Sequence, residues 1–124
     1  MKIDLHCHTK KTKSGETEKR TINPDKFADI LSKNNVGIVS CTNHNNFSIN
    51  DYALFSDASS KKGIVLWPGI ELDVVVNNEK GHVIFICNPN KVDIFDAKVK
   101  SILGASSPDS FEKPIECVLE EFAD

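Results

Sequence analysis

The sequence lacks any long hydrophobic run, any Cys-x-x-Cys pair and any strong excess of charge of one sign. No apolar stretch approaches the roughly 18 residues that span a bilayer, and the N-terminus shows no basic segment followed by an apolar one. We therefore expect no membrane segment and no secretory signal. The formal net charge of −3 gives no reason to expect a basic surface that binds nucleic acid.

Cysteines are few and widely separated, which argues against a thiolate metal cluster. They are Cys7, Cys41, Cys87 and Cys117. Three of them lie within apolar, strand-like runs, a pattern typical of buried free thiols in a reducing compartment. The cysteine pattern therefore predicts a cytoplasmic protein.

The composition fits one small domain that spans residues 1–124. Of the 124 residues, 40% are hydrophobic and 27% are charged, which supplies a core and argues against disorder. Strands are expected at 3–8, 36–42, 64–67 and 83–87, and the chain is expected to stay β-rich after Pro68-Gly69 through Val76. Helices are expected at 24–34, 51–63, 95–104 and 114–122. Helical periodicity places Phe27, Ile30 and Leu31 on one face, and Leu54, Phe55 and Ala58 inward.

This alternation predicts an α/β fold with a largely parallel sheet. Such sheets place their chemistry at the carboxyl ends of the strands. The polar residues expected there are His6, His8, His44 and Glu71. His82 is expected where a strand begins, directly after a turn.

The first candidate ligands form a His-x-His pair. Side chains alternate along a strand, so His6 and His8 point to the same face and together can hold a divalent metal, while Cys7 points into the packing. A structural or surface role for this pair remains an alternative. The same holds for His44, which as a lone loop histidine is often polar surface, and for His82, which is equally compatible with a hairpin edge.

The candidate carboxylate is Glu71, which follows Pro68-Gly69 at the end of an apolar run. A carboxylate there is costly unless it is paired or metal-bound, although a surface glutamate on a hairpin is the alternative. Asp73 shares its face and is a candidate partner. All four histidines of the chain belong to this one set. Their nitrogen and oxygen donors suit zinc, manganese or iron rather than calcium.

Four motifs in order resemble the N-terminal portion of the PHP family, the polymerase and histidinol phosphatase domain. They are D-L-H-C-H-T from Asp4, S-C-T-N-H-N from Ser40, P-G-I-E-L from Pro68 and G-H-V-I-F-I from Gly81, and they span about the first ninety residues. The resemblance implies a distorted (β/α)₇ barrel, incomplete within this chain, with two or three divalent metal ions.

The resemblance also implies a role for each candidate residue. His6 and His8 would hold the first metal, Glu71 would bridge the first and second, His82 would bind the second, and His44 the third. Glu71 and His82 would be the catalytic ligands. Members of the family hydrolyse phosphate esters or act as nucleases, so we expect a metal-dependent phosphoesterase acting on a phosphate ester or a nucleic acid.

Three departures from the family pattern stand out. Asn43 replaces the aspartate of the usual T-D-H motif, so it would orient His44 less strongly or tune the third site. The loop after the first motif contains no histidine, which leaves Glu16 and Glu18 as candidates for a further ligand. No histidine follows His82, so the later ligands are missing. We expect a C-terminal remainder or a partner chain to complete the site, and the chain alone to be inactive or nearly so.

Two other classes remain open. A non-catalytic PHP module in a larger polymerase- or ATPase-linked protein would keep the fold while losing ligands. A metal-dependent amidohydrolase also opens with His-x-His, but its bridging group is commonly a lysine, so Glu71 favours the phosphoesterase. Five basic residues of the loop after the first motif either attract an anionic substrate or form a solvated flexible surface: Lys10, Lys11, Lys13, Lys19 and Arg20.

Overall fold

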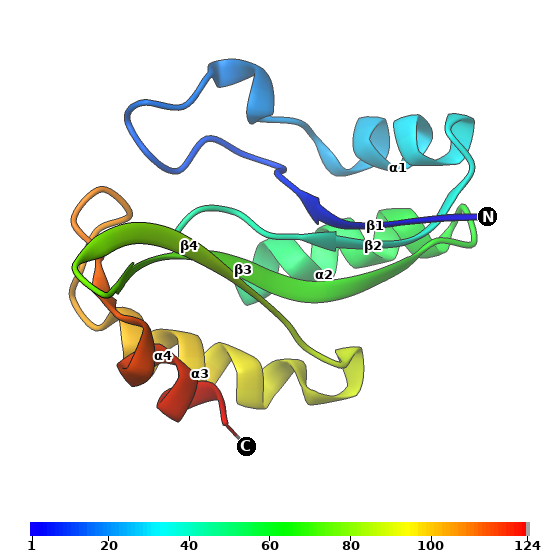
Figure 1. The fold of residues 1–124 in the computed structure, drawn as a ribbon. Helices are drawn as coiled ribbons and strands as arrows, with labels where there is room; N and C mark the ends of the chain where they lie inside the picture. The colour runs from blue at the N-terminus through cyan, green and yellow to red at the C-terminus, as the bar shows by residue number, and fades with distance from the viewer. Residues whose placement is uncertain (124) are drawn as a thin grey trace.

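The computed structural model describes residues 1–123 as an α/β fold built on one curled sheet (Figure 1). Its strands are β1 (Lys2–Cys7), β2 (Val36–Cys41), β3 (Val65–Val76), β4 (Glu79–Ile86) and the short β5 (Lys113–Pro114). Its helices are α1 (Pro24–Lys33), α2 (Ile49–Ser60), α3 (Val92–Leu103) and α4 (Ile115–Phe122), with 3₁₀ turns η1 (Glu18–Arg20) and η2 (Pro89–Lys91). The sheet order is β1-β2-β3-β4, with β5 beside β3, and the predicted α/β class is confirmed.

Strand β3 is longer than the sequence predicted and changes partner halfway. Its first half pairs in parallel with β2 as far as Pro68, and its second half pairs antiparallel with β4 from Gly69 onward. The expectation of a strand ending at Trp67 is therefore wrong, and Glu71 lies inside β3 rather than at a strand end. The sheet is parallel across β1, β2 and β3, while β4 returns as a hairpin through Asn77 and Asn78, both at positive φ.

The hairpin also corrects the placement of His82. The turn is tight, so β4 begins at Glu79 and His82 lies within the strand, directly opposite Asp73. Asparagine adopts positive φ more readily than most residues, which allows two consecutive residues to close the turn.

Side-chain caps set the starts of α1 and α2. Asn23 accepts a hydrogen bond from Lys26 N at 2.8 Å and begins α1, as predicted. Ser48 accepts from Asp51 N at 3.2 Å, so α2 begins at Ile49, two residues before the predicted start. Leu54, predicted to point inward, is 60% exposed, whereas Phe55 and Ala58 of the same helix are buried as expected.

Ile30 of α1 is also largely exposed, while its predicted companions Phe27 and Leu31 are buried. Ile30 and Leu54 are each about 100° around the helix from the buried Leu31 and Phe55, at the edge of the apolar stripe.

Two apolar clusters hold the helices on one face of the sheet. The first packs α1 and α2 on β2 and the start of β3, and contains Phe27, Leu31, Val39, Phe55, Ile64 and Leu66. The second packs α3 and α4 on the rest of β3, and contains Ile70, Leu72, Val74, Phe95, Val99, Ile102, Phe111 and Val118. Because side chains alternate along a strand, Glu71 and Asp73 point to the opposite face from Ile70 and Leu72.

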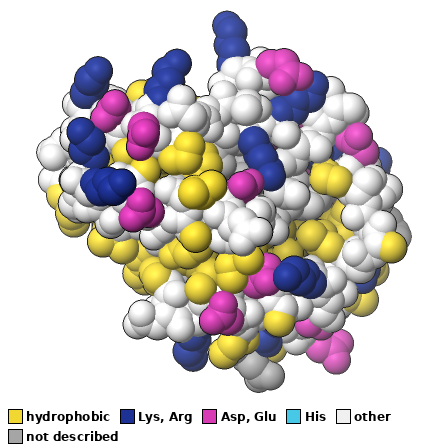
Figure 2. Space-filling view, turned by 180° about the vertical axis from the view of Figure 1, so that it is seen from behind, with side chains coloured by type: hydrophobic (Ala, Val, Ile, Leu, Met, Phe, Trp, Pro, Cys, Tyr) yellow, Lys and Arg dark blue, Asp and Glu magenta, His cyan; other side chains and the backbone are white. Residues whose placement is uncertain are grey.

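That opposite face is where the histidines gather. The face of the molecule drawn in Figure 2 shows a band of hydrophobic side chains and no visible histidine. The exposed histidines therefore lie on another face. Among the described residues, no helix is long and apolar enough to cross a membrane.

All four cysteines are free, as predicted, but their predicted burial is only partly right. Cys7, Cys41 and Cys87 are partly buried, and Cys117 is exposed. Cys7 packs against the cluster under α1 and α2, with its sulfur 3.9 Å from that of Cys41 on the neighbouring strand.

The close approach at Gly69 yields a test of this register. A Cβ added there would meet Ser40 Oγ and lie 2.9 Å from Thr42 Cγ2 and 3.2 Å from the carbonyl oxygen of Phe85. Gly69→Ala should therefore lower the free energy of unfolding by about 1–3 kcal/mol, the usual penalty for overpacking. The measurement is urea unfolding followed by circular dichroism.

Gly81→Ala is the matched control, because a Cβ at Gly81 meets nothing within 4 Å. It should change stability by less than about 0.5 kcal/mol. Equal effects of the two substitutions would show that Gly69 does not pack closely against the neighbouring strands as described.

Candidate metal centre

Glu71 is the centre of the site, and its side chain is only 5% exposed. Strand β3 carries it away from the apolar cluster and toward the loops that follow β1 and β2. The segment after β2 pairs with it through the backbone: Glu71 N donates to Asn43 O at 3.1 Å and Asn45 N donates to Glu71 O at 2.8 Å. This pairing places the intervening residue, His44, directly beside the Glu71 carboxylate.

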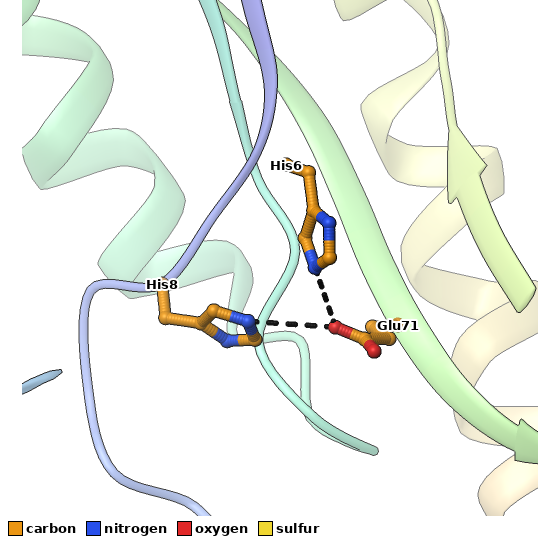
Figure 3. Close-up of side chains that lie close together, drawn as sticks. All are labelled: His6, His8 and Glu71. Atoms are coloured by element: carbon orange, nitrogen blue, oxygen red, sulfur yellow. Dashed lines mark hydrogen bonds and ion pairs between the residues drawn. The ribbon is translucent and has the colours of Figure 1, made fainter. Parts of the chain in front are cut away.

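The two histidines of the first motif converge on one oxygen of Glu71 (Figure 3). His6 Nε2 lies 2.8 Å from Glu71 Oε1, and His8 Nε2 lies 3.4 Å from the same atom. Their ring centroids are 5.5 Å apart. The strand alternation that predicted a shared face for the pair is thus realised, with Cys7 between them directed into the packing.

The other two histidines approach the second oxygen of Glu71. His44 Nε2 lies 3.0 Å from Glu71 Oε2, and His82 Nδ1 lies 3.3 Å from it. The opposite nitrogen of the His82 ring lies 3.0 Å from Asp73 Oδ1. The structure therefore brings all four predicted histidines around one carboxylate, and Asp73 lies close to the far side of the His82 ring.

A second carboxylate, Glu16, joins the site from the loop after β1. Glu16 Oε2 lies 2.7 Å from His44 Nδ1 and is paired with Arg20. Its other oxygen accepts from Thr12 N at 2.9 Å and Lys13 N at 2.8 Å. Of the two loop glutamates named from the sequence, Glu16 thus reaches the site, while Glu18 is exposed and pairs with Lys11.

Three groups of side chains place their donor atoms within 4.8 Å of one another: His6, His8 and Glu71; His8, Glu16 and His44; and His44, Glu71 and His82. Glu71 takes part in two of these groups, and so do His8 and His44. Shared members of this kind suit neighbouring cations, because a carboxylate can bridge two of them.

The hydrogen bonding around the histidines tests whether divalent cations fit. His8 Nδ1 and His44 Nε2 are buried and have no hydrogen-bond partner among the described residues. His44 Nε2 lies near Glu71 Oε2 without the geometry of a hydrogen bond. A buried, unpaired imidazole nitrogen is costly, and a coordinated zinc, manganese or iron ion would satisfy it. The donor set of imidazoles and carboxylates therefore fits such ions.

The protonation states favour the same interpretation. Burial lowers the pKa of His8, and the nearby Arg20 lowers it further, which favours the neutral imidazole that binds metals. Burial by itself raises the pKa of Glu71, but the hydrogen bond from His6 and the charges of His44 and His6 lower it below its ordinary value. Glu71 is therefore ionised, as a metal-bridging carboxylate must be.

Asn43 does not do what the sequence suggested. Its side-chain oxygen accepts from Thr9 N at 2.9 Å, and its amide donates to Thr9 Oγ1 at 3.0 Å. The expectation was that Asn43 would orient His44 less strongly than an aspartate or tune the third site; in the structure Glu16 contacts His44 Nδ1, and Asn43 fastens the loop after β1 to the loop after β2. A neutral amide serves this role because it both donates and accepts.

Four of the five basic loop residues are paired with carboxylates, and Lys19 is exposed. Lys10 lies 3.0 Å from Asp51, Lys11 lies 2.9 Å from Glu18, and Lys13 is paired with Asp73. Arg20 is paired with Glu16, so four of the five basic residues contact carboxylates of the protein itself.

Asn45 is a structural residue that sequence reasoning missed. It is buried at a positive φ of 50°, its oxygen accepts from Asp73 N at 2.9 Å, and its amide donates to Pro108 O at 2.8 Å. The only signal in the sequence was an asparagine directly after a candidate ligand, in a position where asparagine tolerates the left-handed region.

The comparisons with known proteins bear on the fold. No protein-family model and no curated protein sequence matches the chain. Among solved structures, the chain is similar to an amidohydrolase from Chromobacterium violaceum, described with bound sulfate and no metal, at a TM-score of 0.57 and 22% identity. The likeness covers 81% of this chain and 32% of that one, so this chain spans about a third of the solved chain.

At this identity the likeness shows the fold alone, an α/β sheet curled into a half-barrel that matches part of an amidohydrolase barrel. The expectation of an incomplete barrel is confirmed at this level. The narrower PHP resemblance and the roles of the individual ligands stay predictions.

Glu16 gives a testable link between the site and stability. Burial by itself raises its pKa, but the hydrogen bonds from His44 and from the backbone of Lys13 and Thr12 lower it to about 2. A carboxylate with a lowered pKa stabilises the fold above its ordinary pKa, and the contribution is lost as the pH falls through the folded value. In a chelator at pH 7, Glu16→Gln should cost about 1.5–3 kcal/mol, the range for hydrogen bonds to a charged group.

The measurement is urea unfolding of both proteins between pH 7 and pH 3. The difference between them should be full at pH 7 and should shrink below the ordinary value of 4.5. Glu18→Gln, an exposed glutamate of the same loop, should leave stability nearly unchanged. A Glu16→Gln effect that is absent at pH 7, or that grows as the pH falls, would contradict the described contacts.

Proposed function

We propose that the complete domain containing this chain is a metal-dependent phosphoesterase that hydrolyses phosphomonoesters or phosphodiesters, as the PHP resemblance implies. The observation that carries the proposal is a buried glutamate surrounded by four imidazoles, two of which have unpaired buried nitrogens. Such a donor set suits two or three zinc, manganese or iron ions. The likeness to part of an amidohydrolase barrel supports the broader class of metal-dependent hydrolases.

Each side chain has a role in this proposal. His6 and His8 would hold one ion, His82 a second and His44 a third, with Glu71 bridging the first two. Divalent ions bound there would lower the pKa of water so that it attacks phosphorus near neutral pH, and would neutralise charge on the phosphate.

Three residues would orient these ligands. Asp73 Oδ1 lies 3.0 Å from one nitrogen of the His82 ring, while the other nitrogen faces Glu71. Glu16 holds Nδ1 of His44, so Nε2 faces Glu71 in the same way. Arg20 is paired with Glu16 and helps to keep His8 neutral. Partners of this kind fix ring orientation and tautomer in metal sites.

The non-catalytic module, the main rival, rested on two departures from the family pattern. The side chain of Asn43 binds Thr9, and Glu16 supplies the carboxylate that contacts His44 Nδ1. The loop that lacks a histidine supplies Glu16 in its place. Neither departure therefore removes any of the four histidines or Glu71 from the site. The amidohydrolase alternative is less favoured, because its bridging group is commonly a lysine, whereas this site has the carboxylate of Glu71 in the bridging position.

The proposal includes residues from outside this chain. His6 and His82 are 53% and 55% exposed, which leaves room for further ligands on their open side. Strand β1 lies at the edge of the sheet, where a further barrel strand can pair. A C-terminal remainder or a partner chain would supply both. We also keep the prediction of a cytoplasmic location, which the four free thiols support.

Metal binding by the chain itself is the first test. Isothermal titration with Mn²⁺ should show binding, and Glu71→Gln should weaken it by more than the roughly 10–100-fold that loss of an outer partner costs. Glu79→Gln, an exposed glutamate at the start of β4, is the matched control and should leave the affinity unchanged. Equal Mn²⁺ affinities of the unmodified chain and both variants would show that Glu71 is not a metal ligand.

Hydrolysis is the second test, and it requires the complete domain. With Mn²⁺, that protein should hydrolyse p-nitrophenyl phosphate, and His6→Ala combined with Glu71→Ala should abolish the activity. The chain alone should be inactive or nearly so. Full activity of the double variant would refute the catalytic role of these residues. A domain that binds no metal and hydrolyses no phosphate ester would instead be the non-catalytic module.

A further inference from the structure

An open cavity of about 360 Å³ lies next to the metal centre, between the β3–β4 hairpin and the loop that follows α3. We call it the side pocket. His82 belongs to both, since Nδ1 of its ring lies 3.3 Å from Glu71 and its Nε2 lies 3.0 Å from Asp73, which lines the pocket. The alcohol part of a phosphate ester bound at the metal centre could therefore reach the side pocket. The volume lies in the range of small-molecule sites.

The walls of the side pocket are fastened to one another by polar contacts between distant parts of the chain. Asn45 joins Asp73 of β3 to the carbonyl of Pro108. Ser14 of the loop after β1 donates to Asp109 Oδ1 from its backbone at 2.9 Å and from its hydroxyl at 3.2 Å. Both bonds use Oδ1, so a ligand can use Oδ2. A pocket held in this way is ordered before its ligand arrives, which lowers the entropic cost of binding.

The charges of the lining decide what kind of group fits. Three carboxylates line the pocket, those of Asp73, Asp109 and Glu112, against the two ammonium groups of Lys13 and Lys80. Lys13 is paired with Asp73, and Lys80 lies 3.9 Å from Glu112. The pocket therefore has no surplus of positive charge, and a second phosphate would meet unfavourable carboxylates there.

A neutral, hydroxyl-rich group matches this lining best. A hydroxyl both donates and accepts, so it can donate to a carboxylate and accept from an ammonium group in the same pocket. Apolar groups would find little to bind, because the only aromatic residue of the lining, Phe111, is buried in the core behind it.

We propose that the side pocket binds the alcohol part of the substrate and that this part is a sugar or another small polyol. The inference rests on the proposed phosphoesterase function and narrows it. Of the two substrate classes left open, a small phosphomonoester fits, whereas a nucleic-acid strand would bring its neighbouring phosphates against Asp109 and Glu112.

The test measures binding to this chain by isothermal titration in Mn²⁺, with inorganic phosphate, glucose 6-phosphate and pentathymidylate as probes. Inorganic phosphate reports on the metal centre alone. Glucose 6-phosphate should bind roughly tenfold more tightly or better, the gain expected from one or two net hydrogen bonds. Pentathymidylate should bind no more tightly than inorganic phosphate.

The variant Asp109→Asn tests whether the tighter binding of glucose 6-phosphate comes from the side pocket. It should reduce the affinity for glucose 6-phosphate by about three- to tenfold, the loss of about one hydrogen bond, and leave that for inorganic phosphate unchanged. Glu112→Gln should act in the same direction and does not disturb the anchor to Ser14. Asp57→Asn, an exposed aspartate of α2, is the matched control and should change neither affinity.

The outcomes separate the two proposals. If inorganic phosphate binds with Mn²⁺ but glucose 6-phosphate gains nothing, the side-pocket inference is overturned and the phosphoesterase proposal stands. Tighter binding of pentathymidylate than of glucose 6-phosphate overturns it in favour of nucleic acid. If the chain binds no Mn²⁺ and no phosphate, the proposed function fails and the side pocket fails with it as a substrate site.

Discussion

A buried carboxylate surrounded by imidazoles is the constraint on which the rest of this structure depends. Glu71 lies inside a strand, nearly inaccessible to water, with four histidines from three other segments or strands within 3.4 Å of its oxygens. An isolated charge in that position would be strongly unfavourable. The histidines offset this cost, but their burial adds a second one, because His8 and His44 each retain an unpaired buried nitrogen. A cation between these groups accounts for both features at once.

The fold serves this arrangement by giving each half of β3 a separate task. The half before Gly69 extends the parallel sheet, so that the ends of β1 and β2 deliver His6, His8 and His44 to one place. The half after Gly69 forms a hairpin with β4, which brings His82 to the same place from the other side. All four helices pack on the far face of the sheet, so the face with the histidines stays open. The likeness to part of a barrel hydrolase agrees with this division.

The sequence predicted those features that depend on local pattern. Alternation along β1 was enough to place His6 and His8 on one face, and the caps at Asn23 and Pro24 located α1. Features that depend on contacts between distant segments were out of reach. His82 looked like the start of a strand because the turn at Asn77 is tighter than its composition suggested, and only pairing with β3 reveals this.

Loop geometry was equally hidden. Glu16 and Glu18 were indistinguishable in the sequence, and only the folded loop turns Glu16 toward His44. Asn43 stood where the family pattern carries aspartate, which suggested a contact to the neighbouring histidine rather than to Thr9. Leu54 fitted the helical stripe, but it is exposed in the structure.

The central claim is that imidazoles and carboxylates, not the nearby thiols of Cys7 and Cys41, bind the metal. X-ray absorption at the zinc edge of the Zn²⁺-loaded chain tests it most directly. The account predicts a first shell of nitrogen and oxygen at about 2.0–2.1 Å with the outer-shell scattering of imidazole rings. A sulfur shell at about 2.3 Å, or a chain that retains no zinc, would contradict it.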